Sequence, residues 1–202
     1  MTAPRGRPRA FDREAALDAA LFEFWRHGYE ATSIATLTKA MGINPPSLYA
    51  AFGDKRKLFT EAVSRYAKTY GDYGAHAFDQ PTAHEAVEHL LRTIATAFTD
   101  PAHPPGCLVI HGASNTTTAS ADVKEELRGY REGTKQALIE KITTDITKGL
   151  LPPNTDAKAL GTFYATVIQG MSTQAVDGAT REELELLADV ALSAWPGAPQ
   201  GA

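Results

Sequence analysis

The stretch from Thr32 to Phe52, TSIATLTKAMGINPPSLYAAF, constrains the fold most, because it predicts two short helices joined by a tight turn. Its first half repeats inward-facing residues at three- and four-residue spacing, which is typical of a helix. These residues are Ile34, Leu37, Thr38 and Met41. Gly42 permits the left-handed backbone that a tight turn needs, Asn44 is a good N-cap, and Pro45 suits the first position of a new helix. A helix-turn-helix over about 33–52 is therefore predicted.

Two longer helical patterns flank this unit. The first follows Asp12, a plausible N-cap, carries an apolar stripe and stops at Gly28. The second begins after Asp54 and repeats apolar residues as far as Tyr66. We therefore expect a three-helix head over residues 10–70, in which the long helix from Asp54 joins the turn unit to the rest of the chain.

The second helix of such a unit enters the major groove of DNA. Leu48 and Phe52 lie four residues apart and can pack inward, which leaves the other face of this helix for DNA. The candidate DNA-binding residues at its start and on that face are Asn44, Pro45, Pro46, Ser47, Tyr49 and Ala50. Double-stranded DNA is thus the partner that these residues predict.

Basic residues lie on both sides of the turn unit. Lys55, Arg56 and Lys57 occupy the first turn of a helix, where the helix dipole disfavours positive charge and favours an anion. We expect a DNA phosphate near Lys55. Arg5, Arg7 and Arg9 alternate with glycine and proline in residues 1–9, which predicts a flexible basic arm that contacts DNA.

The charge is unevenly distributed along the sequence, so an acidic chain can still bind DNA through its basic part. Residues 1–70 hold 11 Lys and Arg against 7 Asp and Glu, a net charge of +4, whereas the remainder holds 9 against 17, a net charge of −8. Only the head is basic, so the overall charge of −4 does not exclude a nucleic-acid partner.

The run from about Ala10 to Tyr70 resembles the DNA-binding domain of TetR-type transcriptional regulators. The resemblance rests on Phe24, Gly28, Tyr29, Thr32, Ile34, Ala35, Gly42, Ser47, Leu48, Tyr49, Phe52, Lys55 and Leu58. It implies that Ser33, Ser47, Tyr49 and Lys55 contact DNA, with Tyr49 and Lys55 on phosphates. Pro46 stands where the family commonly has a small residue, and Ala50 and Ala51 replace a histidine and an aromatic residue, which removes two possible DNA contacts.

Past residue 70 the chain predicts helices separated by proline and glycine, so the fold class is all-α with a larger helical body over 71–196 and a tail over 197–202. The last two helices carry apolar stripes that are compatible with ordinary core. The resemblance implies instead that they pair across a homodimer. The residues assigned to that interface are Val167, Met171, Leu184, Leu187, Ala191 and Trp195.

The resemblance also implies a cavity in the body for a small organic inducer that releases the protein, most simply a repressor, from a palindromic operator. The candidate lining residues are Phe98, Cys107, His111, Tyr130, Phe163, Tyr164, Ile168, Gln169 and Ser172. We expect about a third of them to touch a ligand, because apolar stripes at helical spacing form core more often than cavity wall.

Two alternatives remain open. Cys107 and His111 share a helical face and would suit a metal- or redox-responsive sensor. Ala50 and Ala51 would suit a ligand-binding module whose head binds DNA weakly. The sequence has no Gly-rich phosphate loop and no G-x-S-x-G elbow, so it predicts neither an enzyme nor a cofactor or resident metal. It has no apolar run long enough for a membrane and no signal peptide, so we expect a cytoplasmic protein.

Overall fold

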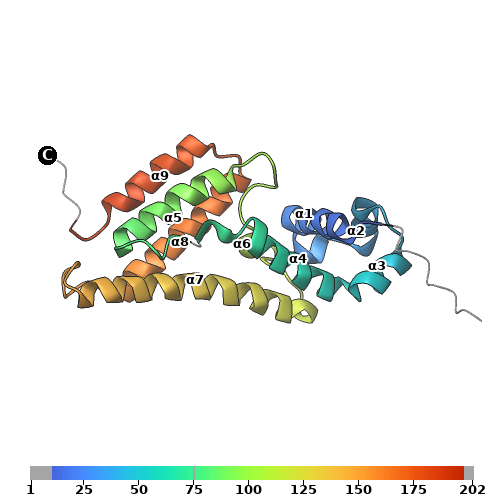
Figure 1. Cartoon of the computed structure of the whole chain (residues 1–202), viewed down its shortest axis with the longest axis horizontal. Coiled ribbons are helices and arrows are strands. Elements are labelled where there is room, and N and C mark those ends of the chain that lie inside the picture. The colour runs from blue at the N-terminus through green and yellow to red at the C-terminus, as the bar shows by residue number, and fades with distance from the viewer. Residues whose placement is uncertain (1–10, 75, 198–202) are drawn as a thin grey trace, which may run out of the picture.

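The computed structural model describes residues 11–74 and 76–197, and in these residues the chain forms helices and turns without any strand. The molecule is elongated, with the head at one end and the body at the other (Figure 1). The expected all-α architecture is confirmed. Arg5, Arg7 and Arg9 and tail residues 198–202 lie outside the described residues.

The described part of the head contains α1 (Arg13–Ala31), α2 (Ile34–Met41), α3 (Pro45–Phe52) and α4 (Lys55–Thr69). It therefore has one helix more than the three expected, because the long helix α4 adds to the other three. The predicted N-caps are confirmed, because the side chains of Asp12, Asn44 and Asp54 accept backbone N–H groups at the starts of α1, α3 and α4. Gly42 ends α2 in the left-handed conformation, with φ 65° and ψ 28°. Large side chains of α1, α3 and α4 fill the core of the head, namely Leu21, Phe24, Leu48, Phe52, Leu58 and Phe59.

Gly28 interrupts α1 three residues before its end. Its φ of 75° and ψ of 171° lie in a region that only glycine adopts readily. The interruption turns the backbone so that the N–H of Tyr29 donates to the carbonyl of Gly112 at 2.8 Å instead of continuing the helical ladder. A residue identified in the sequence as a helix stop thus joins the head to the body.

The body contains α5 (Ala83–Phe98), the short α6 (Leu108–His111), the long α7 (Ala121–Thr147), α8 (Ala157–Val176) and α9 (Arg181–Ser193). Two short 3₁₀ helices, Asp72–Gly74 and Thr118–Ser120, precede α5 and α7. The helix α8 packs against α5, α7 and α9, and α6 lies between this bundle and the head (Figure 1).

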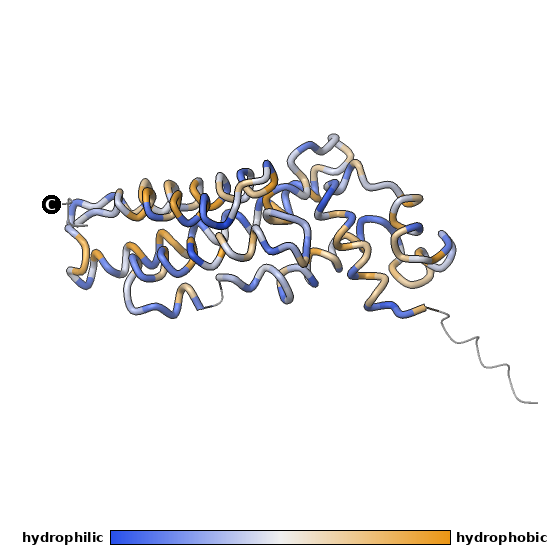
Figure 2. Tube along the Cα trace, turned by 90° about the horizontal axis from the view of Figure 1, so that it is seen from above, coloured by the Kyte–Doolittle hydropathy of each residue, from blue (hydrophilic) through white to orange (hydrophobic). Residues whose placement is uncertain are grey.

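Hydrophobic and hydrophilic segments alternate along much of the chain, as the orange and blue parts of the tube in Figure 2 show. The inward residues of α7 illustrate the pattern, because Val123, Leu127, Leu138 and Ile142 are all buried. No helix in the described part of the chain is both long and apolar enough to cross a membrane.

Candidate DNA-reading helix and ligand cavity

The helix α3 presents one face to solvent at the far end of the head. Leu48 and Phe52 are buried beneath it, as the spacing predicted, whereas Pro46, Tyr49 and Ala50 are exposed. The ring of Tyr49 keeps 48% of its surface accessible, which is unusual for a large aromatic side chain without a partner. This face therefore has the exposure that a DNA-reading helix requires.

The polar residues at the two helix starts have structural roles of their own. The Ser33 hydroxyl accepts the N–H of Thr36 at 3.0 Å, and the Asn44 amide oxygen accepts the N–H of Ser47 at 2.9 Å. Pro45 and Pro46 follow Asn44 as the first two residues of α3. These caps hold the turn unit rigid and leave the Asn44 amide nitrogen free to donate outward.

The three bases in the first turn of α4 lie in three different directions. The Lys55 ammonium lies 4.3 Å from the ring centroid of Tyr29 and 3.5 Å from the carbonyl oxygen of Glu30, and burial lowers its pKa. Arg56 binds Asp122 and Glu126 of α7, the latter at 2.7 Å. Lys57 lies 3.9 Å from Asp54 Oδ2 and keeps 70% of its side chain accessible to solvent. The three bases therefore do not surround one anion.

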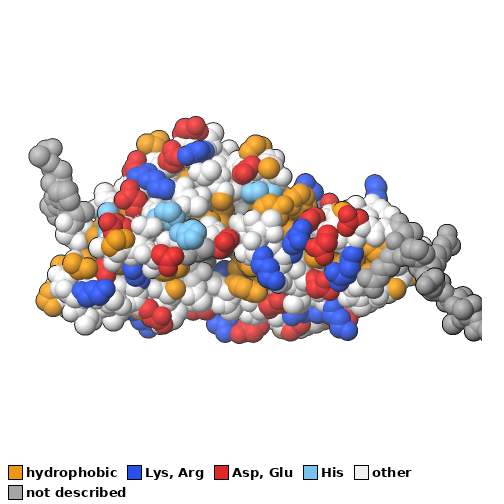
Figure 3. Space-filling model, viewed as in Figure 1, with side chains coloured by type: hydrophobic (Ala, Val, Ile, Leu, Met, Phe, Trp, Pro, Cys, Tyr) orange, Lys and Arg blue, Asp and Glu red, His pale blue; other side chains and the backbone are white. Residues whose placement is uncertain are grey.

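Charge in the described part of the head is nearly balanced. Residues 11–70 hold 8 Lys and Arg against 7 Asp and Glu, so most of the basic character predicted for the head comes from Arg5, Arg7 and Arg9. Basic and acidic side chains are mixed on the face shown in Figure 3. Arg13 and Arg65 contribute to this mixing, since both are paired with acids.

A cavity of about 210 Å³ lies between α4, α6, α7 and α8. Its walls are mainly apolar and aromatic. They are formed by Tyr66, Ala67, Gly71, Tyr73, Gly74, Phe78, Leu90, Cys107, Val109, Ile110, Tyr130, Arg131, Thr134, Ala165, Ile168 and Gln169. Four of the nine residues expected from the sequence are among them, namely Cys107, Tyr130, Ile168 and Gln169.

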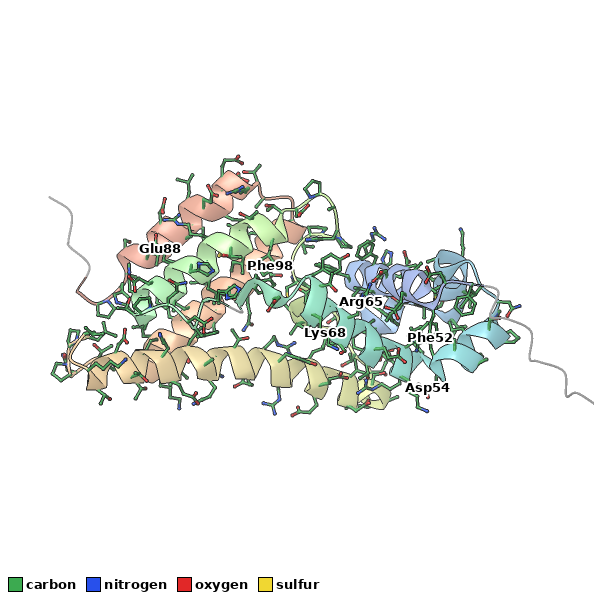
Figure 4. The ribbon with its side chains drawn as sticks, in the orientation of Figure 1. Phe52, Asp54, Arg65, Lys68, Glu88 and Phe98 are labelled. Atoms are coloured by element: carbon green, nitrogen blue, oxygen red, sulfur yellow. The ribbon has the colours of Figure 1, made fainter. Side chains whose placement is uncertain are left out.

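The other five expected residues lie elsewhere. Phe98, at the end of α5 in Figure 4, packs behind the ring of Tyr73. Tyr164 is buried against Trp195 and donates to the carbonyl of Ala191 at 3.0 Å. The remaining three, Phe163, His111 and Ser172, are also absent from the cavity wall. Helical spacing identified inward residues such as Phe98 and Tyr164 but not Phe163, which is exposed, and it does not separate core from cavity wall.

The side chains of Cys107 and His111 have different partners, although the backbone N–H of Cys107 donates to Ser172 Oγ at 2.9 Å. The Cys107 sulfur accepts the hydroxyl of Tyr66 at 3.1 Å and lies 3.2 Å from that of Tyr73, whereas His111 Nε2 lies 3.0 Å from Ser172 Oγ. Burial, together with the nearby Cys107, raises the pKa of both tyrosines well above the ordinary value. No group of three potential metal ligands occurs among the described residues. These contacts do not favour the metal- or redox-responsive sensor over a sensor of an organic ligand.

The expected dimer residues are largely internal to the protomer. Met171, Leu184, Ala191 and Trp195 are buried in its own core, and Val167 and Leu187 pack against that core. The assignment of these residues to a dimer interface stays a prediction, in which only Val167 and Leu187 keep an appreciable part of their surface accessible in the protomer. The large exposed apolar residues of α8 and α9 are Phe163, Val176, Leu186 and Val190, with 41%, 49%, 65% and 71% of their surface accessible.

A chain of contacts connects the cavity wall with the head. Val109 and Ile110 of α6 line the cavity, and α6 is followed directly by Gly112, which accepts the N–H of Tyr29. The neighbouring Glu30 carboxylate accepts both the N–H and the hydroxyl of Thr117, and hydrogen bonding by Ser120 and Thr117 lowers the pKa of this carboxyl. Sequence patterns did not reveal these contacts, because each joins segments more than 80 residues apart.

Two family models match the chain over these same units. Residues 16–62 match the model for bacterial regulatory proteins of the tetR family, and residues 83–187 match the tetracyclin repressor-like C-terminal domain. The chain belongs to the TetR family. The family expected from the head alone is confirmed over most of the protein, and members of this family are DNA-binding transcriptional regulators.

Named relatives agree with this assignment. The chain is 36% identical to the HTH-type transcriptional repressor ComR of Escherichia coli (strain K12), over 95% of this chain and 92% of ComR. It is 31% identical to the repressor BdcR of the same strain, over 89% and 86%. A solved structure of a cysteine mutant of the TetR family regulator CifR, complexed with 26-bp double-strand operator DNA, is 45% identical, with a TM-score of 0.88 over 94% of this chain and 100% of CifR.

Proposed function

We propose that this protein is a transcriptional repressor that binds a palindromic operator as a homodimer and leaves it when a small organic molecule occupies the cavity. The exposed face of α3 is the observation that carries the proposal, because nothing in the described protomer covers Tyr49 or Ala50. The operator complex of the CifR mutant supports it, since the two chains share 45% identity and fold. We infer that the protein acts in the cytoplasm, beside the DNA.

The exposed apolar side chains of α8 and α9 support a dimer. Leu186 and Val190 lie one helical turn apart on α9, and such side chains gain free energy when a partner removes them from water. A two-fold dimer would set two copies of α3 about 34–36 Å apart, which matches successive major grooves. The proposed interface is therefore this outer surface of α8 and α9.

The proposal is tested by fluorescence anisotropy of a labelled duplex from the region upstream of the protein's own gene, beside a scrambled duplex. Specific binding that weakens as salt rises is the expected result, because protein bases displace counterions from phosphates. Equal binding to both duplexes at every salt concentration would contradict it for this region.

Tyr49→Ala tests the face of α3 directly. Loss of one hydrogen bond to a charged phosphate costs about 1.5–3 kcal/mol, so operator affinity should fall about 12- to 150-fold. The melting temperature should stay unchanged, because the ring supports no core contact. An operator affinity equal to that of the wild type would remove Tyr49 from the DNA contacts.

A further inference from the structure

Arg131 is the charged residue in the cavity wall that the proposed function leaves unexplained. The inward residues of α7 run through Val123, Leu127, Leu138 and Ile142, and Arg131 takes the place of an apolar residue between them. It is partly buried, and burial lowers its pKa. A guanidinium in this position has lost part of its hydration and requires compensation from another group.

No carboxylate supplies that compensation. Among the described residues of the body, Arg92, Arg128 and Arg181 each form an ion pair with an acid, whereas Arg131 forms none. Its single hydrogen bond runs from Nη1 to the carbonyl oxygen of Val109 at 2.7 Å. A guanidinium has five N–H donors, so most of its hydrogen-bonding capacity remains unused.

We propose that the cavity takes a small organic monocarboxylate and that Arg131 binds the carboxylate group. This inference rests on the proposed function, since the same cavity is the inducer site there. The mainly apolar wall receives the hydrocarbon part, and the guanidinium pairs with the two carboxylate oxygens in the fork geometry that both groups favour. Thr134, one turn further along α7, adds a hydroxyl to the wall.

The cavity limits the size of this acid. A cavity of about 150 Å³ holds benzene with its six carbons. A volume of about 210 Å³ therefore suits a ligand with on the order of eight non-hydrogen atoms. Hexanoate and benzoate have that size, and hexanamide and benzamide match them in shape without the charge. These four compounds are the probes.

The position of Arg131 also gives a reason for this acid to affect the head. The carbonyl that Arg131 binds belongs to α6, and α6 leads directly into Gly112, the acceptor of the Tyr29 N–H. A carboxylate bound to the Arg131 guanidinium therefore acts on α6 through the hydrogen bond from Arg131 to the Val109 carbonyl.

The test is calorimetric titration of the full-length protein near pH 7 with the two acids and the two amides. The wild type should bind at least one acid ten or more times as tightly as its amide. Arg131→Gln should weaken that acid about 10- to 100-fold and leave the amide unchanged, as expected for loss of a charge-assisted pair. Arg128→Gln is the matched control, because Arg128 lies one turn away on α7, pairs with Glu125 and stays outside the cavity wall.

The proposal is overturned if the amides bind the wild type as tightly as the acids, if neither acid binds in the millimolar range, or if Arg131→Gln keeps the wild-type affinity for the acid. The comparison of acid and amide on the wild type does not depend on whether the variant folds. Circular dichroism of Arg131→Gln shows whether that variant is folded, and only a folded variant is compared with the wild type. Operator binding is measured on the same sample. Intact operator binding without acid binding overturns this inference alone, and acid binding without operator binding overturns the DNA-binding part of the proposed function alone.

Discussion

Gly28→Ala should destabilise the protein more than an ordinary glycine substitution in the head. With φ 75° and ψ 171°, Gly28 occupies a conformation that costs an L-residue about 1–3 kcal/mol. An added Cβ would also lie 3.3 Å from the carbonyl oxygen of Gly112, the atom that accepts the Tyr29 N–H. The substitution therefore strains the backbone and crowds the junction between head and body at once.

The magnitude follows from these terms. Strain of about 1–3 kcal/mol, plus about 0.5–1.5 kcal/mol if the Tyr29 hydrogen bond is lost, is offset by about 0.4–1 kcal/mol because alanine restricts the unfolded chain. The net loss of unfolding free energy should be about 1–4 kcal/mol. Gly42→Ala is the matched control, because Gly42 also has a positive φ, of 65°, but no atom lies within 4 Å of an added Cβ. Its net loss should be about 0–1.5 kcal/mol, since left-handed helical backbone costs about 1–2 kcal/mol.

Urea unfolding at one protomer concentration measures both variants, which is necessary because dimer stability depends on concentration. Gly28→Ala should lose about 0.5–2.5 kcal/mol more than Gly42→Ala, because it adds about 0–1 kcal/mol of backbone strain and about 0.5–1.5 kcal/mol for the lost hydrogen bond. If the two variants unfold at the same urea concentration with the same slope, the contact between Gly28 and Gly112 does not stabilise the fold and the reasoning is refuted.

Three further predictions concern the body. Leu186→Glu should give monomers in light scattering, because it places a charge on the exposed apolar surface of α9. Leu150→Glu, at another exposed leucine beyond the end of α7, should remain dimeric. A dimeric Leu186→Glu would exclude this surface as the interface. Gly161→Ala should lower the free energy of unfolding in urea by about 1–3 kcal/mol, because the added Cβ would lie 2.6 Å from Ile139 Cγ1. Gly129→Ala, with open space around the added Cβ, should raise it by about 0.5–1 kcal/mol. Equal effects would refute the close packing of α7 on α8. Burial lowers the pKa of His111 below its ordinary value of 6.5, so the unfolded chain binds this proton at a higher pH than the folded one. The free energy of unfolding should therefore fall as pH drops below about 6.5, and His111→Gln should make this fall smaller. If the pH dependence is the same in the variant, it belongs to other groups.

The head could be predicted in detail because its signals are local. Asp12, Asn44 and Asp54 cap helices through contacts two or three residues away, and Gly42 is identified by the turn that it makes. Leu48 and Phe52 occupy the inward face that their spacing required. Each of these assignments depends on residues within a few positions of one another, where sequence pattern carries most of the information.

The cavity wall and the proposed dimer surface could not be predicted because they depend on packing between distant helices. Phe98 and Cys107 both belong to apolar stretches, yet only Cys107 reaches the cavity. Leu186 was overlooked because the regular stripe through Leu184 and Ala188 explained α9 without it. Arg131 did carry a signal that sequence reading could have used, namely a charge at an inward position between Leu127 and Leu138.

The ion pairs of Arg56 with α7 affect how the DNA-binding assay is interpreted. Arg56 belongs to the head, and its partners Asp122 and Glu126 belong to the body, so dissolved ions weaken this link as they weaken contacts with phosphate. The salt dependence of operator affinity therefore combines counterion release from DNA with loosening of the protein's own joint. The number of phosphate contacts calculated from this slope alone would therefore be too high, because part of the slope comes from the Arg56 ion pairs.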